Sequence, residues 1–208
     1  MTQVPTGNDH CVEPSGGVKR YFEPRRKRMM VRIGPGAFFV SKGNDEILTA
    51  VLGSCVSITV YDPVSRIGGM NHFMLPVREA DDSGPNSFDL RYGAHAIEVL
   101  INEILNTECT RDRIEVKVFG GANLIGASRP IGTMNVQFAE AYLAREGMSV
   151  VARDVGGHLP RRIEFSPLSG RVRTKLLEEG MTDHVKATES ELQNRLRHTG
   201  AAGDVDLF

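Results

Sequence analysis

Residues 46–63, EILTAVLGSCVSITVYDP, hold two strand patterns joined by a short Gly-Ser turn. Residues 46–52 are mainly apolar, whereas residues 55–61 alternate strictly between apolar and polar side chains, as a half-buried strand does. One face of the second strand carries Val56, Ile58 and Val60, and the other carries Cys55, Ser57, Thr59 and Tyr61. The pattern therefore predicts two neighbouring strands, with a thiol on the polar face at the mouth of the second.

The remaining chain continues mostly in strand patterns. Further strands are predicted at 70–76 and 113–119, a strand and turn at 148–157, and a hairpin with Ser-Pro and Ser-Gly in its turn at 161–177. Residues 91–108 predict a helix, because one stripe at helical spacing carries Ile97, Leu100, Ile101, Ile104 and Leu105. A second helix is predicted from Asn135, a good N-cap, to about Gly147. The polar residues 77–89 between two such elements are typical of a lid or binding loop.

Runs of strands without a regular strand-helix-strand rhythm favour a layered α+β domain over a doubly wound fold. The predicted domain spans residues 21–177. Residues 1–20 are polar and rich in Gly and Pro, which predicts a flexible N-terminal tail. Residues 178–208 predict a polar C-terminal tail, partly helical or disordered. Its capping-box pattern at Thr188 and Glu191 is followed by only Leu192 and Leu196 as apolar support, which indicates a marginal helix.

Composition limits the classes of partner. The 208 residues are 40% hydrophobic and 25% charged with a net charge of −1, so neither nucleic acid nor an anionic membrane is indicated. The first residues lack the pattern of a signal peptide, and no apolar run approaches the roughly 20 residues of a membrane span, so a cytoplasmic protein with reduced thiols is expected. The basic cluster at 25–28 is typical of a solvated surface turn, more than of a contact with an acidic partner.

Cys55 is the candidate nucleophile among three cysteines. Cys11, Cys55 and Cys109 form no Cys-x-x-Cys pair, so neither a disulfide framework nor a zinc site is indicated, and no cofactor is expected. A free cysteine is most often an inert core residue. Here, however, Gly53 and Ser54 permit a tight turn whose N–H groups could face a ligand.

A thiol nucleophile needs a base, and His72 is the first choice because its short apolar segment follows the Cys55 strand closely. The alternatives are weaker: His10, His184 and His198 lie in polar tails, His95 in the predicted helix and His158 in a glycine-rich loop. A third group that orients the base could be Thr49, Asp62 or Asn71, and spacing does not choose among them. The glycine-rich stretches 119–126 and 154–160 lack phosphate-binding spacing, so they predict tight turns that line a site or close strands.

Several motifs together resemble the CheD family of chemoreceptor glutamine deamidases. They are LTAVLGSCVSITVYDPVSRIGGMNHFMLP, RYGAHAIEVLINEI, KVFGGANL, IGTMN and DVGGHLPRRIEFSPLSGRV, in this order within residues 21–176. The resemblance implies a single-domain α/β/β sandwich that converts glutamine side chains of methyl-accepting chemotaxis receptors to glutamate. Two residues depart from the family pattern: Met134 stands where an arginine is usual, and Pro160 where a glycine is frequent.

The resemblance also implies roles for residues. Cys55 is the expected nucleophile, His72 the general base and Thr49 the residue that helps to orient His72. Gly53, Ser54 and Asn71 are candidates for binding the substrate or its oxyanion, and no metal is expected. Two alternatives stay open: a receptor glutamate methylesterase, and a non-catalytic adapter that binds receptors or a CheC-type phosphatase through surfaces such as Leu124–Ile125 or the basic cluster.

Overall fold

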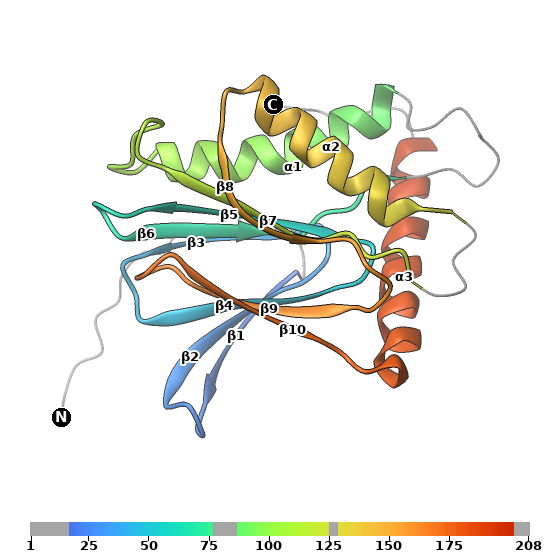
Figure 1. The fold of residues 1–208 in the computed structure, drawn as a ribbon, viewed down its shortest axis with the longest axis horizontal. Coiled ribbons are helices and arrows are strands. Elements are labelled where there is room, and N and C mark those ends of the chain that lie inside the picture. Colours follow the sequence, from blue (N-terminus) through green and yellow to red (C-terminus); the bar gives the residue numbers. More distant parts are fainter. Residues whose placement is uncertain (1–16, 77–86, 125–128, 202–208) are drawn as a thin grey trace.

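The computed structural model describes residues 17–76, 87–124 and 129–201, which fold into two stacked five-stranded sheets and three helices. The sheet that we call the outer sheet has the order β1 (Val18–Glu23), β2 (Arg28–Ile33), β4 (Glu46–Leu52), β9 (Arg161–Ser166) and β10 (Arg171–Leu176). The central sheet has the order β3 (Phe38–Lys42), β6 (Ile67–Asn71), β5 (Val56–Asp62), β7 (Glu115–Gly120) and β8 (Val150–Val155). Helices α1 (Ser87–Leu105) and α2 (Ile131–Arg145) cover the free face of the central sheet (Figure 1).

This arrangement confirms the predicted α/β/β layering. Helix α3 (Thr182–Ala201), which follows the short 3-10 helix Glu179–Met181, stands across one end of both sheets (Figure 1). The predicted stripe of α1 packs on the Val56, Ile58 and Val60 face of β5. Within the described ranges, no helix combines the length and the apolarity that a membrane span requires.

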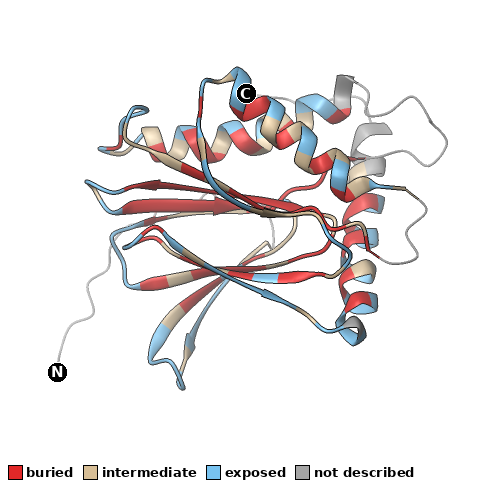
Figure 2. Cartoon of the chain, in the orientation of Figure 1, coloured by how far each residue is buried: buried red, intermediate tan, exposed pale blue. Residues whose placement is uncertain are grey.

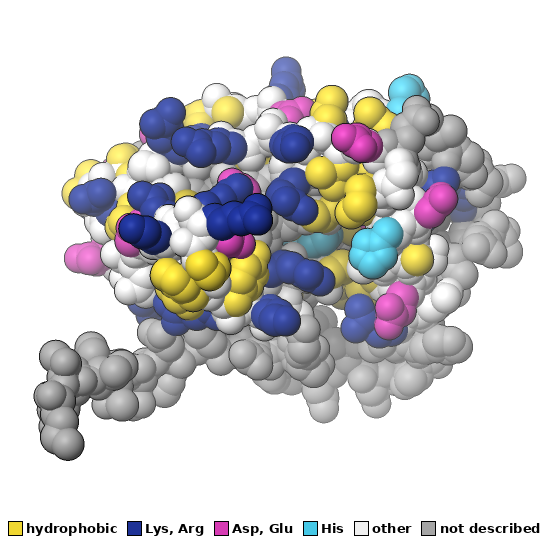
Figure 3. All heavy atoms as spheres, turned by 90° about the horizontal axis from the view of Figure 1, so that it is seen from below, with side chains coloured by type: hydrophobic (Ala, Val, Ile, Leu, Met, Phe, Trp, Pro, Cys, Tyr) yellow, Lys and Arg dark blue, Asp and Glu magenta, His cyan; other side chains and the backbone are white. Residues whose placement is uncertain are grey.

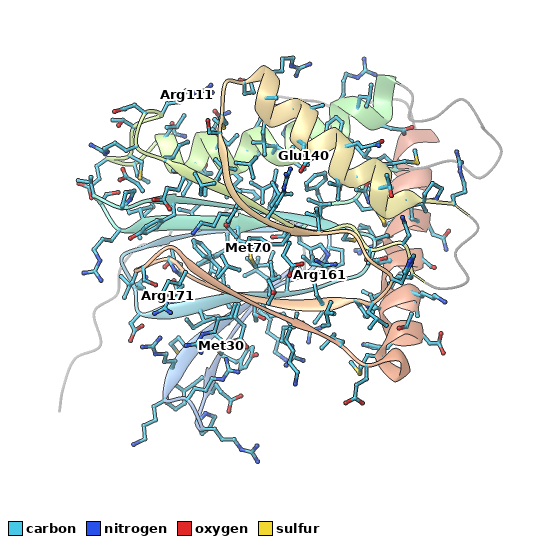
Figure 4. All side chains as sticks on the ribbon, in the orientation of Figure 1. Met30, Met70, Arg111, Glu140, Arg161 and Arg171 are labelled. Carbon is cyan, nitrogen blue, oxygen red and sulfur yellow. The ribbon has the colours of Figure 1, made fainter. Side chains whose placement is uncertain are left out.

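The second face of β5 is buried as well, which corrects the picture of a half-exposed strand. All seven residues of β5 are buried, because the outer sheet covers the face that carries Ser57, Thr59 and Tyr61 (Figure 2). Cys55, Tyr61 and Met70 belong to the apolar cluster between the sheets, into which Met70 points (Figure 4). The cysteine therefore sits in the layer between the two sheets.

Strand β6 lies earlier in the chain than the sequence predicts. The Asp-Pro and Gly-Gly pairs within residues 62–69 predict a turn over that whole segment, yet β6 pairs with β5 from Ile67 and ends at Asn71. Within this strand Gly68 and Gly69 have to be glycine, because a Cβ there would come within 2.8 Å of Phe165 and 2.7 Å of Leu100. The two glycines thus allow the helix layer and the outer sheet to approach the central sheet closely.

The helices and termini also differ from prediction. Helix α1 begins at Ser87, within the expected loop, and residues 77–86 of that loop lie outside the described residues. Helix α2 begins at Ile131 after Pro130 instead of at Asn135, although it does end before Gly147, which has a positive φ of 68°. Val18–Arg20 belong to β1 and not to a tail, whereas residues 1–16 lie outside the described residues.

Other predicted elements are confirmed. Strand β4 has the predicted bounds, and β9 and β10 form the predicted antiparallel hairpin. Residues 25–27 of the basic cluster lie in the exposed β1–β2 turn and Arg28 begins β2; Arg26 pairs with Glu164 at 2.7 Å. Lysine and arginine side chains gather over the outer face of the outer sheet (Figure 3).

Candidate active site

The turn formed by Gly53, Ser54 and Cys55 is fixed by hydrogen bonds that its three backbone carbonyl groups accept. Gly121 N–H donates to the Cys55 carbonyl at 2.8 Å, and Ala122 N–H donates to the Gly53 carbonyl at 2.7 Å. The Asn135 side-chain amide donates to the remaining carbonyl, that of Ser54, at 2.8 Å. These bonds confirm that the glycine-rich stretch after β7 is a tight turn that lines this region.

The N–H groups of the same three residues converge on one carboxylate. Glu189 of α3 accepts hydrogen bonds from Gly53 N–H and Cys55 N–H through Oε1, both at 3.0 Å. Its Oε2 accepts from Ser54 N–H at 3.0 Å and from the Ser54 hydroxyl at 2.7 Å. Three consecutive N–H groups aimed at one point form an anion-binding concavity. Gly53 and Ser54 therefore lie where oxyanion donors are expected, and Cys55 N–H joins them.

Cys55 is fully buried beside this carboxylate. Burial raises the pKa of the Cys55 thiol well above its usual value, and the negative charge of Glu189 raises it further. A low-dielectric site disfavours a thiolate, and a neighbouring carboxylate adds repulsion. With α3 in this position the sulfur is held as the neutral thiol.

His72 shares a face of the chain with Cys55. Val56 and Phe73 exchange two backbone hydrogen bonds of 2.9 Å each as an antiparallel bridge. Cys55 precedes Val56 and His72 precedes Phe73. In an antiparallel pair, two such residues lie diagonally across from each other on the same face, roughly 7–8 Å apart. The bridge thus brings together the two residues that the sequence singled out as nucleophile and base.

The hydrogen bond of His72 fixes its tautomer. Its Nδ1 lies 3.1 Å from the carbonyl oxygen of Ile33. A carbonyl can only accept, so Nδ1 carries the hydrogen and Nε2 keeps a lone pair. Nε2 is buried and has no hydrogen-bond partner among the described residues. Burial lowers the pKa of His72, while the Ile33 carbonyl and the charge of Glu189 oppose this, so the ring is a neutral base at neutral pH.

Thr49 lies in the same region but does not contact His72 through a hydrogen bond. Its hydroxyl donates to the Ile163 carbonyl on β9 at 2.9 Å. Thr49, His72 and Glu189 all line one cavity of about 330 Å³. The Ile33 carbonyl, which sequence reasoning missed, orients His72 here, and a role of Thr49 in orienting the imidazole stays a prediction.

Asn71 and Asp62 are engaged elsewhere. The Asn71 side chain accepts from Ile58 N–H at 2.8 Å and donates to the Ala96 carbonyl at 2.9 Å, which ties α1 to β5. Asp62 forms a 2.7 Å ion pair with Arg113 at the far end of β5. The structure thus does not bring either residue to the turn, and Asn71 acts as a link between layers.

Arg161 links the two sheets at the end of the molecule where α3 stands. It is buried, and its guanidinium donates to the Asp154 and Gly156 carbonyls at the end of β8. Figure 4 shows it between the sheets, on the side where α3 stands. Among the described residues, no group of three or more His, Cys, Asp or Glu side chains is placed to hold a metal ion.

Asn135 is a supporting residue that the sequence reasoning assigned wrongly, as a helix cap. It is fully buried, and its side-chain oxygen accepts from Leu75 N–H at 2.9 Å while its nitrogen donates to the Ser54 carbonyl. It therefore joins the turn that carries Cys55 to the segment that carries His72. The available signal was the IGTMN motif, in which Asn135 is the last residue.

Replacing Asn135 should destabilise the protein and impair the site. Asn135→Ala leaves Leu75 N–H and the Ser54 carbonyl without their partner, at about 1–3 kcal/mol for each buried group. Asn135→Asp keeps the acceptor for Leu75 but sets a carboxyl oxygen against the Ser54 carbonyl in a buried site, which is also unfavourable. Thermal unfolding should place both variants below wild type, and the exposed Gln137→Ala on the same helix should match wild type. Equal stability of all four proteins would contradict this role.

Comparison with known proteins agrees with the arrangement. A family model described as CheD chemotactic sensory transduction matches residues 74–176. A protein of Halorhodospira halophila named "Probable chemoreceptor glutamine deamidase CheD" is 41% identical over 202 residues, which cover 95% of this chain and 93% of that protein. Proteins of the same name from Rhodopseudomonas palustris and Bordetella avium are 42% and 45% identical, over 92% and 82% of this chain and 90% and 74% of theirs.

Fold and site together define a class: an α/β/β sandwich with a buried thiol at a strand mouth, N–H groups around it and a neutral imidazole on the same face. With relatives of this identity and coverage, the chain belongs to the CheD family.

Proposed function

We propose that this chain is a chemoreceptor glutamine deamidase, which hydrolyses glutamine side chains of chemotaxis receptors to glutamate and releases ammonia. The relatives at about 40% identity carry this name, and they match most of the chain. The observation that carries the proposal is the convergence of Gly53, Ser54 and Cys55 N–H on one carboxylate oxygen pair beside the thiol. These donors suit the oxygen of a side-chain amide under attack.

The proposed reaction uses Cys55 and His72 in two steps. The Cys55 thiol gives its proton to His72 Nε2, and the sulfur attacks the side-chain carbonyl carbon of glutamine. The oxygen becomes an oxyanion held by the turn N–H groups, and the imidazolium returns the proton to the departing nitrogen, which leaves as ammonia. A water molecule, deprotonated by Nε2, then attacks the thioester carbon. The carbon–sulfur bond breaks, the thiol is restored and glutamate is released.

The proposal also covers orientation and cellular context. The Ile33 carbonyl accepts a hydrogen bond from His72 Nδ1 and so orients the ring. Thr49, which lines the same cavity as His72, is proposed to help to orient the imidazole. Receptor cytoplasmic regions are the proposed substrates, so the reaction is placed in the cytoplasm, with a CheC-type phosphatase as a proposed partner. None of these steps requires a metal or an organic cofactor.

The deciding experiment incubates the full chain with purified receptor cytoplasmic fragments. Mass spectrometry of the fragments should show conversion of particular glutamines to glutamate, together with release of ammonia. Methylated fragments in a parallel reaction should release no methanol. Methanol without glutamine conversion would instead identify a methylesterase, and receptor binding without either product would identify an adapter.

A further inference from the structure

Helix α3 covers the candidate active site with a glutamate. Glu189 is buried, and its carboxylate takes all three N–H groups of the turn as well as the Ser54 hydroxyl. The contact joins residues more than 130 positions apart in the sequence. Helix α3 stands directly beside this end of the sheets (Figure 1). The turn is therefore occupied by a side chain of its own protein.

The occupant has the chemistry of the reaction product. A glutamine that has been deamidated is a glutamate whose carboxylate lies between the oxyanion donors and the thiol. Glu189 reproduces this group, with Oε1 shared between the N–H groups of Gly53 and Cys55. A carboxylate that accepts several backbone N–H bonds is a strongly held ligand.

The rest of α3 fits the surface on one helical face. Val185 packs with Ala122 and Leu124 four residues before Glu189, and Leu192 joins the apolar cluster between the sheets. Gln193 Nε2 donates to the Leu75 carbonyl at 3.1 Å, four residues after Glu189. Residues spaced by three and four positions share a face of a helix. The protein surface around the Cys55 turn thus accepts a helix whose central glutamate or glutamine is flanked by apolar residues and by a side-chain amide on the same helical face.

Gly53 makes this close approach possible. A Cβ at Gly53 would lie 2.8 Å from Val185 Cγ1, 2.9 Å from Glu189 Oε1 and 2.9 Å from Leu124 Cδ1. The turn therefore admits a helix only because residue 53 has no side chain.

We propose that the face under α3 is the binding surface for a substrate helix, and that α3 occupies it as an intramolecular mimic of the product. This proposal rests on the proposed deamidase function for the identity of the substrate. Cys55 is fully buried and Glu189 of α3 holds the N–H groups of its turn, so a receptor glutamine can use these donors only when α3 moves away. A tethered segment such as α3 competes with a receptor helix at an effective concentration on the order of millimolar. The docking of α3 therefore determines the receptor concentration at which the surface becomes occupied by substrate.

The first test measures access to the thiol in the full chain, without any receptor. Iodoacetamide labelling of Cys55, followed by peptide mass spectrometry, should be at least roughly tenfold faster in Glu189→Ala than in wild type, because bonds to a charged acceptor are lost. The exposed Glu191→Ala on the same helix should label like wild type. Labelling of the buried Cys109 in the same samples reports global unfolding and should not change. Equal Cys55 labelling in wild type and Glu189→Ala would overturn the proposal.

The second test uses the mimic as a substrate. Glu189→Gln places a glutamine side chain on the same helix beside Cys55, and it should convert slowly to glutamate at position 189 within the purified protein. The double variant with Cys55→Ala should keep the glutamine. Persistence of the introduced glutamine in a Glu189→Gln protein that deamidates receptor fragments would overturn the product-mimic assignment.

Kinetics with receptor fragments separate the two proposals. Glu189→Ala should lower KM and leave kcat near the wild-type value, because a competing occupant weakens binding without changing the chemical step. An unchanged KM would contradict competition by α3. If Cys55 labelling accelerates as expected while no variant converts any receptor glutamine, the covering role of α3 stands and the proposed deamidase function fails.

Discussion

Cys55→Ala should abolish conversion of receptor glutamines to glutamate. The variant keeps the N–H groups of the turn and His72 but has no atom that can form the thioester. Loss of the nucleophile in a serine-protease triad costs on the order of 10⁶-fold in kcat. The measurement is mass spectrometry of a receptor fragment after incubation with variant and wild type at equal concentration. Conversion by Cys55→Ala at the wild-type rate would refute the covalent mechanism.

Cys109→Ala is the matched control for this experiment. Cys109 is also buried and free, but its sulfur contacts the Ser65 and Thr107 hydroxyl oxygens at 3.2 and 3.1 Å and belongs to the core cluster of the helix layer. Its removal costs some packing and leaves the turn at Cys55 untouched. Deamidation by this variant should match wild type, as it should for a substitution of Cys11, which lies outside the described residues.

His72→Gln should reduce deamidation by roughly 10²–10⁴-fold, the usual contribution of a general acid–base group. Glutamine has a similar length and a polar amide, yet it has no basic nitrogen. Kinetics on the receptor fragment give the rate, and thermal unfolding verifies that the variant is folded. Wild-type activity in a folded His72→Gln protein would rule out His72 as the base.

The pH profile of wild type tests the same role independently. The reaction needs neutral His72, and burial lowers the pKa of this imidazole below its usual 6.5. The acid limb of kcat/KM should therefore have its midpoint below pH 6.5, with activity rising as pH increases through it. A midpoint at or above the usual imidazole pKa of 6.5 would contradict the lowered pKa.

Much of the fold follows from local sequence pattern. The apolar run of β4, the alternation of β5, the stripe of α1 and the turn residues of the β9–β10 hairpin each predicted their element. The same patterns put Cys55 after a turn of small residues and His72 shortly downstream. Each of these signals depends on residues that are close in the chain, where backbone geometry alone decides which side chains share a face.

Tertiary structure decided the rest of the site. Asn135 has the chemistry of a helix cap, but its amide is used by Ser54 and Leu75, which come from distant segments. Helix α3 has few apolar residues, and its docking depends on Glu189 meeting N–H groups over 130 positions away. A sequence states that a carboxylate or an amide is present, whereas only the folded chain determines which buried group it must satisfy. That is why the thiol could be found from sequence, and the glutamate that covers it could not.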